Sequence, residues 1–238
     1  MAATNEGDSA SEPSSILETW GTWIDRIKRD LIYLHHHREL WKATTDAIIE
    51  RAPASPAVWI NHYGQLYVNG QAMAIRRIIR AKGPDTISLG RFMESIEEHA
   101  EVLCRSAVVE RFVARTDGAE HWFDYVGDSY DQDWNDGTGQ LDLAKVRRDR
   151  AEINRIAGDV IELADVAVAH ISAQARPALT FGELDGAIVQ TGELFQKYAG
   201  LVTSTHYVLT PAVDEWRSSF YEPLFDKPWP GWPQWSDE

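Results

Sequence analysis

Apolar residues recur at steps of three and four residues along a long stretch of this sequence, from residue 15 to residue 51. This is the period of an α-helix with one apolar face, and such a face must be buried against other elements. The segment APASP at 52–56 ends the helix, because proline cannot continue it. The positions that form the apolar face are Ile16, Trp20, Trp23, Ile27, Leu31, Leu34, Trp41 and Ile48.

Helical spacing continues through most of the remaining chain. It predicts helices over 57–81, 89–115, 141–173 and 181–203, with a long surface loop over 116–141. No stretch shows the sustained alternation of apolar and polar residues that is typical of a strand. The sequence therefore predicts an all-α fold, a helical bundle of about five principal helices, several of them antiparallel and joined by short loops.

Two capping patterns fix where helices begin. Ser88 or Thr86 is placed to cap the helix that follows GPDT, since each can accept a hydrogen bond from a backbone amide of the first turn. Thr180 and Glu183 form a Thr-x-x-Glu capping box, in which each side chain satisfies a backbone amide next to the other. The capping box predicts that the last helix starts directly after Thr180.

The two ends of the chain differ from the helical region. Residues 1–14 are small, polar and acidic, and we expect a disordered leader before a domain at 15–205. The tail at 206–238 is rich in Trp and Pro, and its Trp229, Trp232 and Trp235 are spaced three apart. A polyproline II ribbon would align these three indoles on one edge. Such a tail either packs on its own domain or a symmetry mate, or docks a partner.

Charge and composition limit the classes of function. The net charge is −14, with 37 acidic and 23 basic residues, so loose adsorption to nucleic acid or anionic lipid is opposed and any such contact must be local. Cys104 is the sole cysteine and cannot form an internal disulfide. The sequence has no apolar run long enough for a membrane span and no signal-peptide pattern at its start. We therefore expect a cytoplasmic protein with no membrane partner.

Three consecutive histidines, His35, His36 and His37, at first indicate a metal cluster. Consecutive residues of a helix point about 100° apart, so three in a row do not converge on one ion. We expect exposed or interfacial histidines, with no metal and no cofactor; a pH-sensitive interface is the alternative.

A basic cluster ends the helix predicted at 57–81. It holds Arg76, Arg77, Arg80 and Lys82 with no acidic residue among them, although the chain as a whole is strongly acidic. Positive charge at a helix C-terminus also complements the helix dipole, which is a purely structural explanation. The functional alternative is a contact with phosphate or an RNA backbone.

His170 lies near the end of the helix predicted at 141–173, just before the break at ARPAL. In this position a side chain can face a cleft between helices or subunits. A single histidine among apolar residues is more often a hydrogen-bonded core or interface residue than a catalyst. The segment ELADVAVAHIS leaves both interpretations open.

Four segments in order resemble the AbiU2-like branch of the HEPN superfamily. They are LWKATTDAII, IRRIIR with ISLGRFMESI, ELADVAVAHIS, and TFGELDGAI with LFQKYAGL. The resemblance spans about Leu17 to Val202 and implies a helical, often homodimeric protein of abortive-infection (anti-phage) or toxin–antitoxin defence. It also implies a metal-independent ribonuclease in which histidine acts as general acid or base and arginine stabilises the phosphorane. His170 matches the histidine of the family's Arg-x(4–6)-His motif.

The arginine of that motif has no counterpart at the matching positions, which hold Asp165, Ala164 and Leu163. Asp165 suits the polar residue that often follows the motif arginine. Either Arg76 or Arg77 reaches His170 from another helix, which gives an RNase with a rearranged site, or the protein is an inactive binding or regulatory module. In the second case Asp165 and His170 are hydrogen-bonded at an interface, and a protein partner or antitoxin is expected. A helical scaffold that docks through the tail is the third interpretation.

Overall fold

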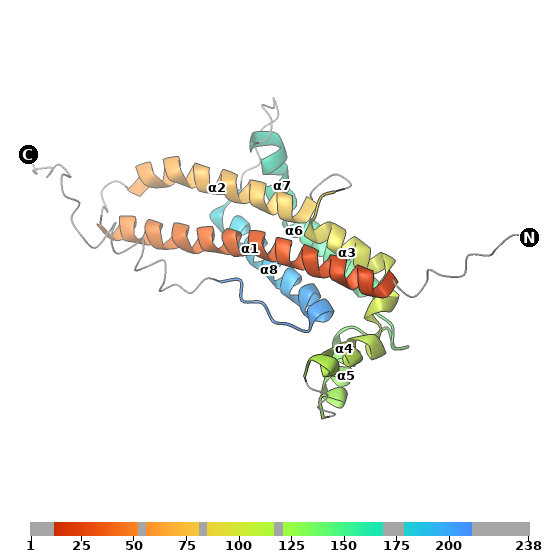
Figure 1. Ribbon diagram of the computed structural model, residues 1–238. Coiled ribbons are helices and arrows are strands. Elements are labelled where there is room, and N and C mark those ends of the chain that lie inside the picture. Colours follow the sequence, from red (N-terminus) through yellow and green to blue (C-terminus); the bar gives the residue numbers. More distant parts are fainter. Residues whose placement is uncertain (1–11, 52–55, 81–84, 117–120, 169–178, 211–238) are drawn as a thin grey trace, which may run out of the picture.

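The computed structural model describes residues 12–51, 56–80, 85–116, 121–168 and 179–210 (Figure 1). Within these ranges every regular element is helical, apart from one isolated bridge between Asn135 and Leu141. The all-α prediction is confirmed, but the described residues form eight α-helices rather than five principal ones, with a 3₁₀ turn η1 and a π-helical turn η2. The elements are α1 (Glu12–Arg51), α2 (Pro56–Arg80), α3 (Leu89–Glu98), η1 (Ala100–Leu103), α4 (Arg105–Arg115), α5 (His121–Asp133), α6 (Leu143–Ile156), α7 (Gly158–Leu163), η2 (Ala164–Val168) and α8 (Phe181–Thr203).

The long helices α1 and α2 run antiparallel and side by side, and α8 crosses behind them (Figure 1). The apolar face predicted for α1 is confirmed where it meets the core, because Trp20, Ile27, Leu31 and Leu34 are all buried. The Trp20 indole also donates a hydrogen bond from Nε1 to Ser95 Oγ at 2.9 Å, so its polar atom is satisfied inside the core.

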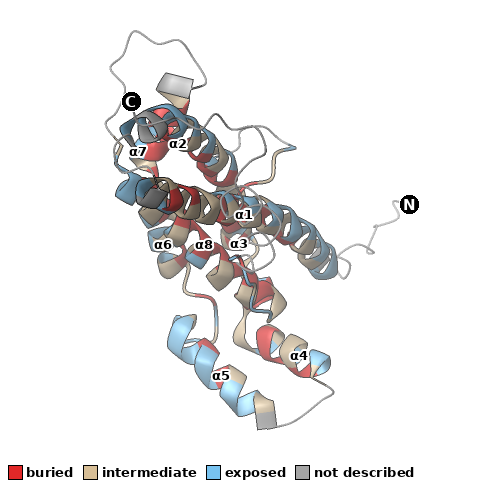
Figure 2. Ribbon diagram, turned by 90° about the vertical axis from the view of Figure 1, so that its left-hand side faces the viewer, coloured by how far each residue is buried: buried red, intermediate tan, exposed pale blue. Residues whose placement is uncertain are grey.

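Helix α8 has buried residues on several of its faces. The predicted capping box is present: Glu183 N–H donates to Thr180 Oγ1 at 3.2 Å, and Thr180 N–H donates to Glu183 Oε2 at 2.8 Å. Figure 2 shows that buried residues of the surrounding helices turn inward, whereas α5 is largely exposed. The bundle is thus built around α8.

The helix predicted over 89–115 is interrupted. Ser88 caps α3 as expected, by accepting a hydrogen bond from Arg91 N–H at 3.2 Å, but α3 ends at Glu98. Arg111 Nη1 donates to Val102 O at 2.9 Å and Tyr130 Oη donates to Leu103 O at 2.7 Å. These tertiary hydrogen bonds satisfy carbonyls that a continuous helix would use, so the chain turns and restarts as α4.

The surface loop predicted over 116–141 is wrong in its central part, which forms α5. Helix α5 packs beside α4 through Trp122 and Phe112, whose ring centroids lie 6.0 Å apart. Arg105 Nε also binds Asp131 Oδ2 at 2.9 Å and so links the two helices. The many Asp and Gly residues obscured this helix in the sequence, because its stability comes from contacts with α4.

The single helix predicted over 141–173 is also interrupted. Its first part, α6, is capped by Asp142, which accepts a hydrogen bond from Lys145 N–H at 3.0 Å. A turn at Ala157 separates α6 from α7, directly before Gly158, a poor helix former. Residues 164–168 then widen into the π-helical turn η2. Turns of π-helix are rare in proteins, and those that do occur often lie at functional sites.

The first helix begins three residues before the predicted start of the domain at residue 15. Residues 12–14 belong to α1 rather than to a leader, while residues 1–11 lie outside the described residues. After α8 the chain runs back along the bundle, where Tyr207 O accepts a hydrogen bond from Gln196 Nε2 at 2.7 Å and Leu209 is buried. The rest of the Trp-rich tail, 211–238, lies outside the described residues.

None of the helices in the described ranges is long and apolar enough to cross a membrane.

Candidate functional site: an arginine-lined pocket between α1 and α2

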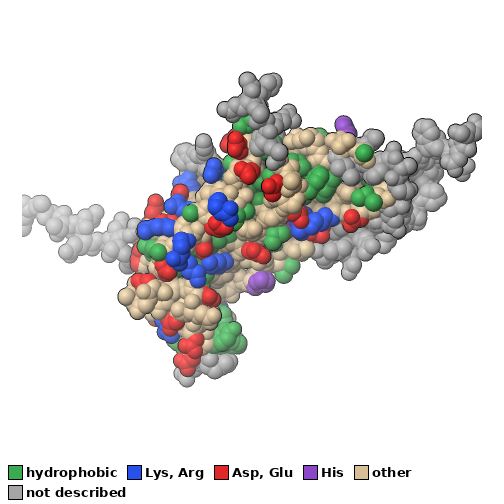
Figure 3. Space-filling model, turned by 180° about the vertical axis from the view of Figure 1, so that it is seen from behind, with side chains coloured by type: hydrophobic (Ala, Val, Ile, Leu, Met, Phe, Trp, Pro, Cys, Tyr) green, Lys and Arg blue, Asp and Glu red, His purple; other side chains and the backbone are tan. Residues whose placement is uncertain are grey.

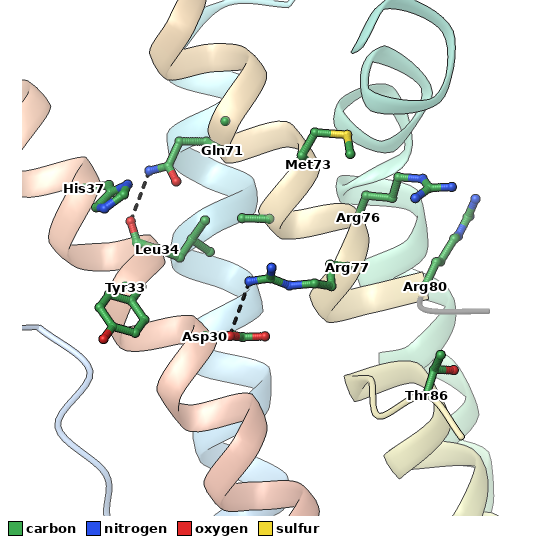
Figure 4. A pocket seen from close by; sticks show the side chains of 12 residues that line it. Asp30, Tyr33, Leu34, His37, Gln71, Met73, Arg76, Arg77, Arg80 and Thr86 are labelled. Atoms are coloured by element: carbon green, nitrogen blue, oxygen red, sulfur yellow. Dashed lines mark hydrogen bonds and ion pairs between the residues drawn. The ribbon is translucent and has the colours of Figure 1, made fainter. Parts of the chain in front are cut away.

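A pocket of about 620 Å³ lies between α1 and α2, on the side away from α8 (Figure 4). This volume falls in the range of about 300–1,000 Å³ that is typical of ligand sites. The α1 wall carries Asp30, Tyr33, Leu34 and His37, and the α2 wall carries Gly70, Gln71, Met73, Ala74, Arg76, Arg77 and Arg80. Three of the four residues of the basic cluster predicted from the sequence therefore line one cavity.

Helical periodicity explains why these residues meet. Asp30, Tyr33, Leu34 and His37 follow i, i+3, i+4 and i+7 spacing, so they share one face of α1. The buried Leu34 forms an apolar floor between the polar residues, and its carbonyl accepts a hydrogen bond from Gln71 Nε2 at 3.0 Å. This bond ties α1 to α2 at the base of the pocket.

Arg77 points from α2 toward α1, where its Nη2 lies 3.3 Å from Asp30 Oδ1 (Figure 4). Its side chain is 63% exposed, so the guanidinium stands in the mouth of the pocket rather than in the core. An exposed ion pair of this kind adds little stability. Its main consequence is to place the guanidinium between α2 and Asp30 of α1.

Arg76 and Arg80 point to the other side of α2. Arg76 Nε forms an ion pair with Asp165 Oδ1 in η2, and Arg80 Nε donates to Asn154 Oδ1 in α6 at 3.0 Å. Among the described residues, Arg76 and Arg77 have carboxylate partners, whereas the recorded partner of Arg80 is a neutral amide. Arg80 therefore carries the least compensated charge of the three.

The prediction that Arg76 or Arg77 reaches His170 from the second helix stays a prediction, because His170 lies outside the described residues. Arg76 contacts Asp165, five residues before His170, while Arg77 faces Asp30 on α1. His170 and Lys82 lie outside the described residues. The π-helical turn carries Asp165 toward α2, and no periodicity in the sequence indicated that turn.

The three adjacent histidines have three different environments. His37 is exposed and lines the pocket, whereas His36 is intermediate. His35 is buried, which corrects the expectation of exposed or interfacial histidines. Its imidazole lies against Gly192 of α8, where an added Cβ would be 2.6 Å from His35 Nε2. Burial lowers the pKa of His35, and the nearby Arg38 lowers it further. Among the described residues, no three potential ligands are grouped to hold a metal ion.

A second basic region lies on the face shown in Figure 3, where Lys and Arg side chains gather over α6 with acidic side chains among them. There Arg147 Nε binds Glu97 Oε2 at 2.9 Å, and Arg150 Nη1 binds Glu94 Oε1 at 2.7 Å. Arg155 pairs with Glu152 one turn away at 2.6 Å. These cations are matched by carboxylates, so this region offers less net positive charge than the end of α2.

Comparisons with protein-family models, with curated proteins and with solved structures find no match to this chain. The fold and the site therefore define its class: an all-α protein with an arginine-lined pocket between two antiparallel helices. The arginines of α2 were predicted from the sequence, but the α1 wall was not. The face at 30, 33, 34 and 37 was visible as helical spacing, but nothing in the sequence showed which helix it opposes.

Proposed function

We propose that this chain is a HEPN-like protein of bacterial anti-phage or toxin–antitoxin defence that cleaves RNA without a metal ion. The ion pair between Arg76 and Asp165 is the observation that carries the proposal. In the family pattern the motif arginine precedes the histidine by five to seven residues, and Asp165 precedes His170 by five. The Arg76 guanidinium therefore contacts a residue within the segment where the family pattern has its arginine, which supports the proposal.

The roles follow from the chemistry of RNA cleavage. His170 acts as general base or acid in the attack of the 2′-hydroxyl on the phosphate. Arg76 donates to the non-bridging oxygens, where negative charge grows in the transition state. Its side chain is 33% exposed and that of Asp165 is 47% exposed, so a phosphate can reach the pair and exchange with the carboxylate.

The other cations bind the strand on either side of the reacting phosphate. Arg77 and Arg80 line the same pocket as Arg76, and Lys82 follows two residues after the end of α2. Local positive charge of this kind holds a phosphodiester backbone against the strongly acidic background of the chain. The active form is a homodimer in which two such sites face each other, and light scattering should show twice the 26.9 kDa chain mass.

Cleavage assays test the catalytic roles. Purified protein is incubated in EDTA with transfer RNA and with RNA oligomers, beside His170→Ala, Arg76→Ala and Arg155→Ala. The first two variants should lose cleavage by at least about 100-fold, the lower range for a catalytic proton-transfer group. Arg155→Ala is the matched control, because Arg155 pairs with Glu152 on the exposed surface of α6. Cleavage that survives His170→Ala, or a wild type that does not cleave, contradicts the proposal.

A second function, RNA binding without cleavage, is favoured by the same ion pair. Asp165 neutralises Arg76, so in a regulatory module the pair would be a closed structural contact that limits phosphate binding. In that case Asp165→Asn releases Arg76 and strengthens RNA binding, while His170→Ala changes nothing. If Asp165→Asn leaves affinity unchanged in a protein that does not cleave, this alternative fails as well.

A further inference from the structure

The α1 side of the pocket carries aromatic and apolar side chains in addition to charged ones. Tyr33 projects from α1 beside the mouth of the pocket with 59% of its surface exposed, so its ring is open to a ligand. The buried Leu34 and the small Ala74 form the floor between the helices. An exposed ring, an apolar floor and an arginine therefore border one cavity.

We propose that this pocket takes one unpaired nucleotide of a single-stranded RNA, with its base against Tyr33 and its phosphate on Arg77. The inference rests on the proposed function in taking RNA as the ligand, and it concerns α1 rather than the catalytic residues. It adds a recognition site that selects unpaired over paired RNA.

Arg77 suits the phosphate because its guanidinium already lies at the pocket mouth. Asp30 Oδ1 forms an ion pair with Nη2 at 3.3 Å, and the Asp30 side chain is only 23% exposed. The Arg77 side chain is 63% exposed. The part of its guanidinium that does not contact Asp30 faces the pocket mouth. A guanidinium donates through several N–H groups in one plane, so it can bind Asp30 and a phosphate oxygen together.

Tyr33 suits an unpaired base for two reasons. Aromatic rings stack on nucleobases of any sequence, because every base has a π-face. In an A-form duplex the bases are stacked inside the helix, so a ring on a helix surface cannot reach one of their faces. A nucleotide turned out from a single strand can enter the space between α1 and α2, whereas a base pair in a duplex cannot.

Gly70 provides a way to close the pocket without disturbing the fold. An added Cβ at Gly70 meets no atom within 4 Å, whereas at Gly64, six residues earlier, it would lie 3.1 Å from the Phe181 ring. Gly64 is therefore needed for packing, while Gly70 borders open space within the pocket. Leucine at position 70 would fill that space and also favour the helix.

The test measures binding by fluorescence anisotropy with a labelled 2′-O-methyl RNA 12-mer, which cannot be cleaved by attack of a 2′-hydroxyl. Gly70→Leu and Tyr33→Ala should each raise the Kd about tenfold, as expected for loss of one stacked base. Gly21→Leu is the matched control, because Gly21 is also helical with nothing within 4 Å of an added Cβ, and it lies in α1 outside the pocket. Thermal melts should show that all three variants remain folded.

Two further measurements sharpen the assignment. Arg77→Gln should reduce the slope of log K against log salt by about 0.7, the value for one phosphate contact on a single strand. The wild type should bind the single strand more tightly than the same strand in a duplex. Equal affinity for both forms, or unchanged binding by Gly70→Leu, overturns the proposal, as does a wild type that does not bind RNA.

Failure here differs from failure of the proposed catalysis. A wild type that binds the single strand through Gly70 and Tyr33 but cleaves no RNA would contradict the ribonuclease and leave the nucleotide pocket standing. If the wild type cleaves RNA but Gly70→Leu and Tyr33→Ala leave binding unchanged, the ribonuclease proposal stands and the nucleotide pocket is contradicted.

Discussion

Several arginine–aspartate pairs join helices of this bundle, and two of them, Arg38–Asp185 and Arg76–Asp165, differ in how tightly they are held. Arg38 of α1 binds Asp185 of α8 through two bonds, Nε to Oδ1 at 2.6 Å and Nη2 to Oδ2 at 2.8 Å. Lys42 adds a third contact to Asp185 at 2.8 Å. Arg76 of α2 binds Asp165 of η2 through a single recorded contact.

Exposure separates the pairs further. The Arg38 and Asp185 side chains are 17% and 27% exposed, whereas those of Arg76 and Asp165 are 33% and 47% exposed. A two-bond pair that is largely shielded from water fixes geometry, while a one-bond pair open to water exchanges partners readily. Arg38–Asp185 thus belongs to the architecture, whereas Arg76–Asp165 is open to the exchange that the proposed function requires.

The largest expected effect is on stability, at the shielded pair. Arg38→Met should lower the free energy of unfolding by about 2 kcal/mol, because it removes charged hydrogen bonds and leaves Asp185 partly buried. Urea unfolding monitored by circular dichroism measures this. The double variant with Asp185→Asn should lose less than the sum of the single variants. Additive losses would mean that the two residues do not stabilise each other.

The buried histidine beside the same pair makes stability depend on pH. Burial and Arg38 hold the pKa of His35 below its ordinary value of 6.5, so the unfolded chain takes up a proton that the folded chain resists. The free energy of unfolding is therefore highest above pH 6.5, where His35 is neutral in both states. It decreases as the pH falls below 6.5, because the unfolded chain is protonated first. Asp185 stays ionised over this pH range and so does not contribute to the dependence. Burial raises the pKa of Asp185, but hydrogen bonds from Arg38 and Lys42 outweigh burial and lower it from 3.8.

Urea unfolding at pH 7.5 and pH 5.5 tests this dependence. The wild type should lose stability at the lower pH, and His35→Gln should lose less over the same interval. His37→Gln is the matched control, because His37 is exposed on the same helix two residues away. If His35→Gln keeps the full pH dependence of the wild type, another group is responsible.

The smallest expected effect on stability is at the exposed pair. Arg76→Met should change the free energy of unfolding by no more than about 0.5 kcal/mol, as for other solvent-exposed ion pairs. The same variant should abolish RNA cleavage. If Arg76→Met lowers the free energy of unfolding by about 2 kcal/mol, as expected for Arg38→Met, the two pairs do not differ and Arg76 is a structural residue.

The elements that the sequence predicted well are those with a local physical cause. The stripe on α1, the Ser88 cap and the Thr180–Glu183 box depend on residues within a few positions of each other. The errors lie where distant residues intervene. The break after α3 depends on hydrogen bonds from Arg111 and Tyr130, and α5 depends on packing against α4.

The candidate site shows the same division. The sequence by itself determined that three arginines end one helix and that Asp30, Tyr33 and His37 share a face of another, because helical period fixes neighbours along one element. Only the tertiary structure decided that these two faces border one pocket and that Arg76 and Arg77 turn to opposite sides of α2. Packing around α8 brings the helices together, and periodicity within one helix holds no information on which helix lies opposite.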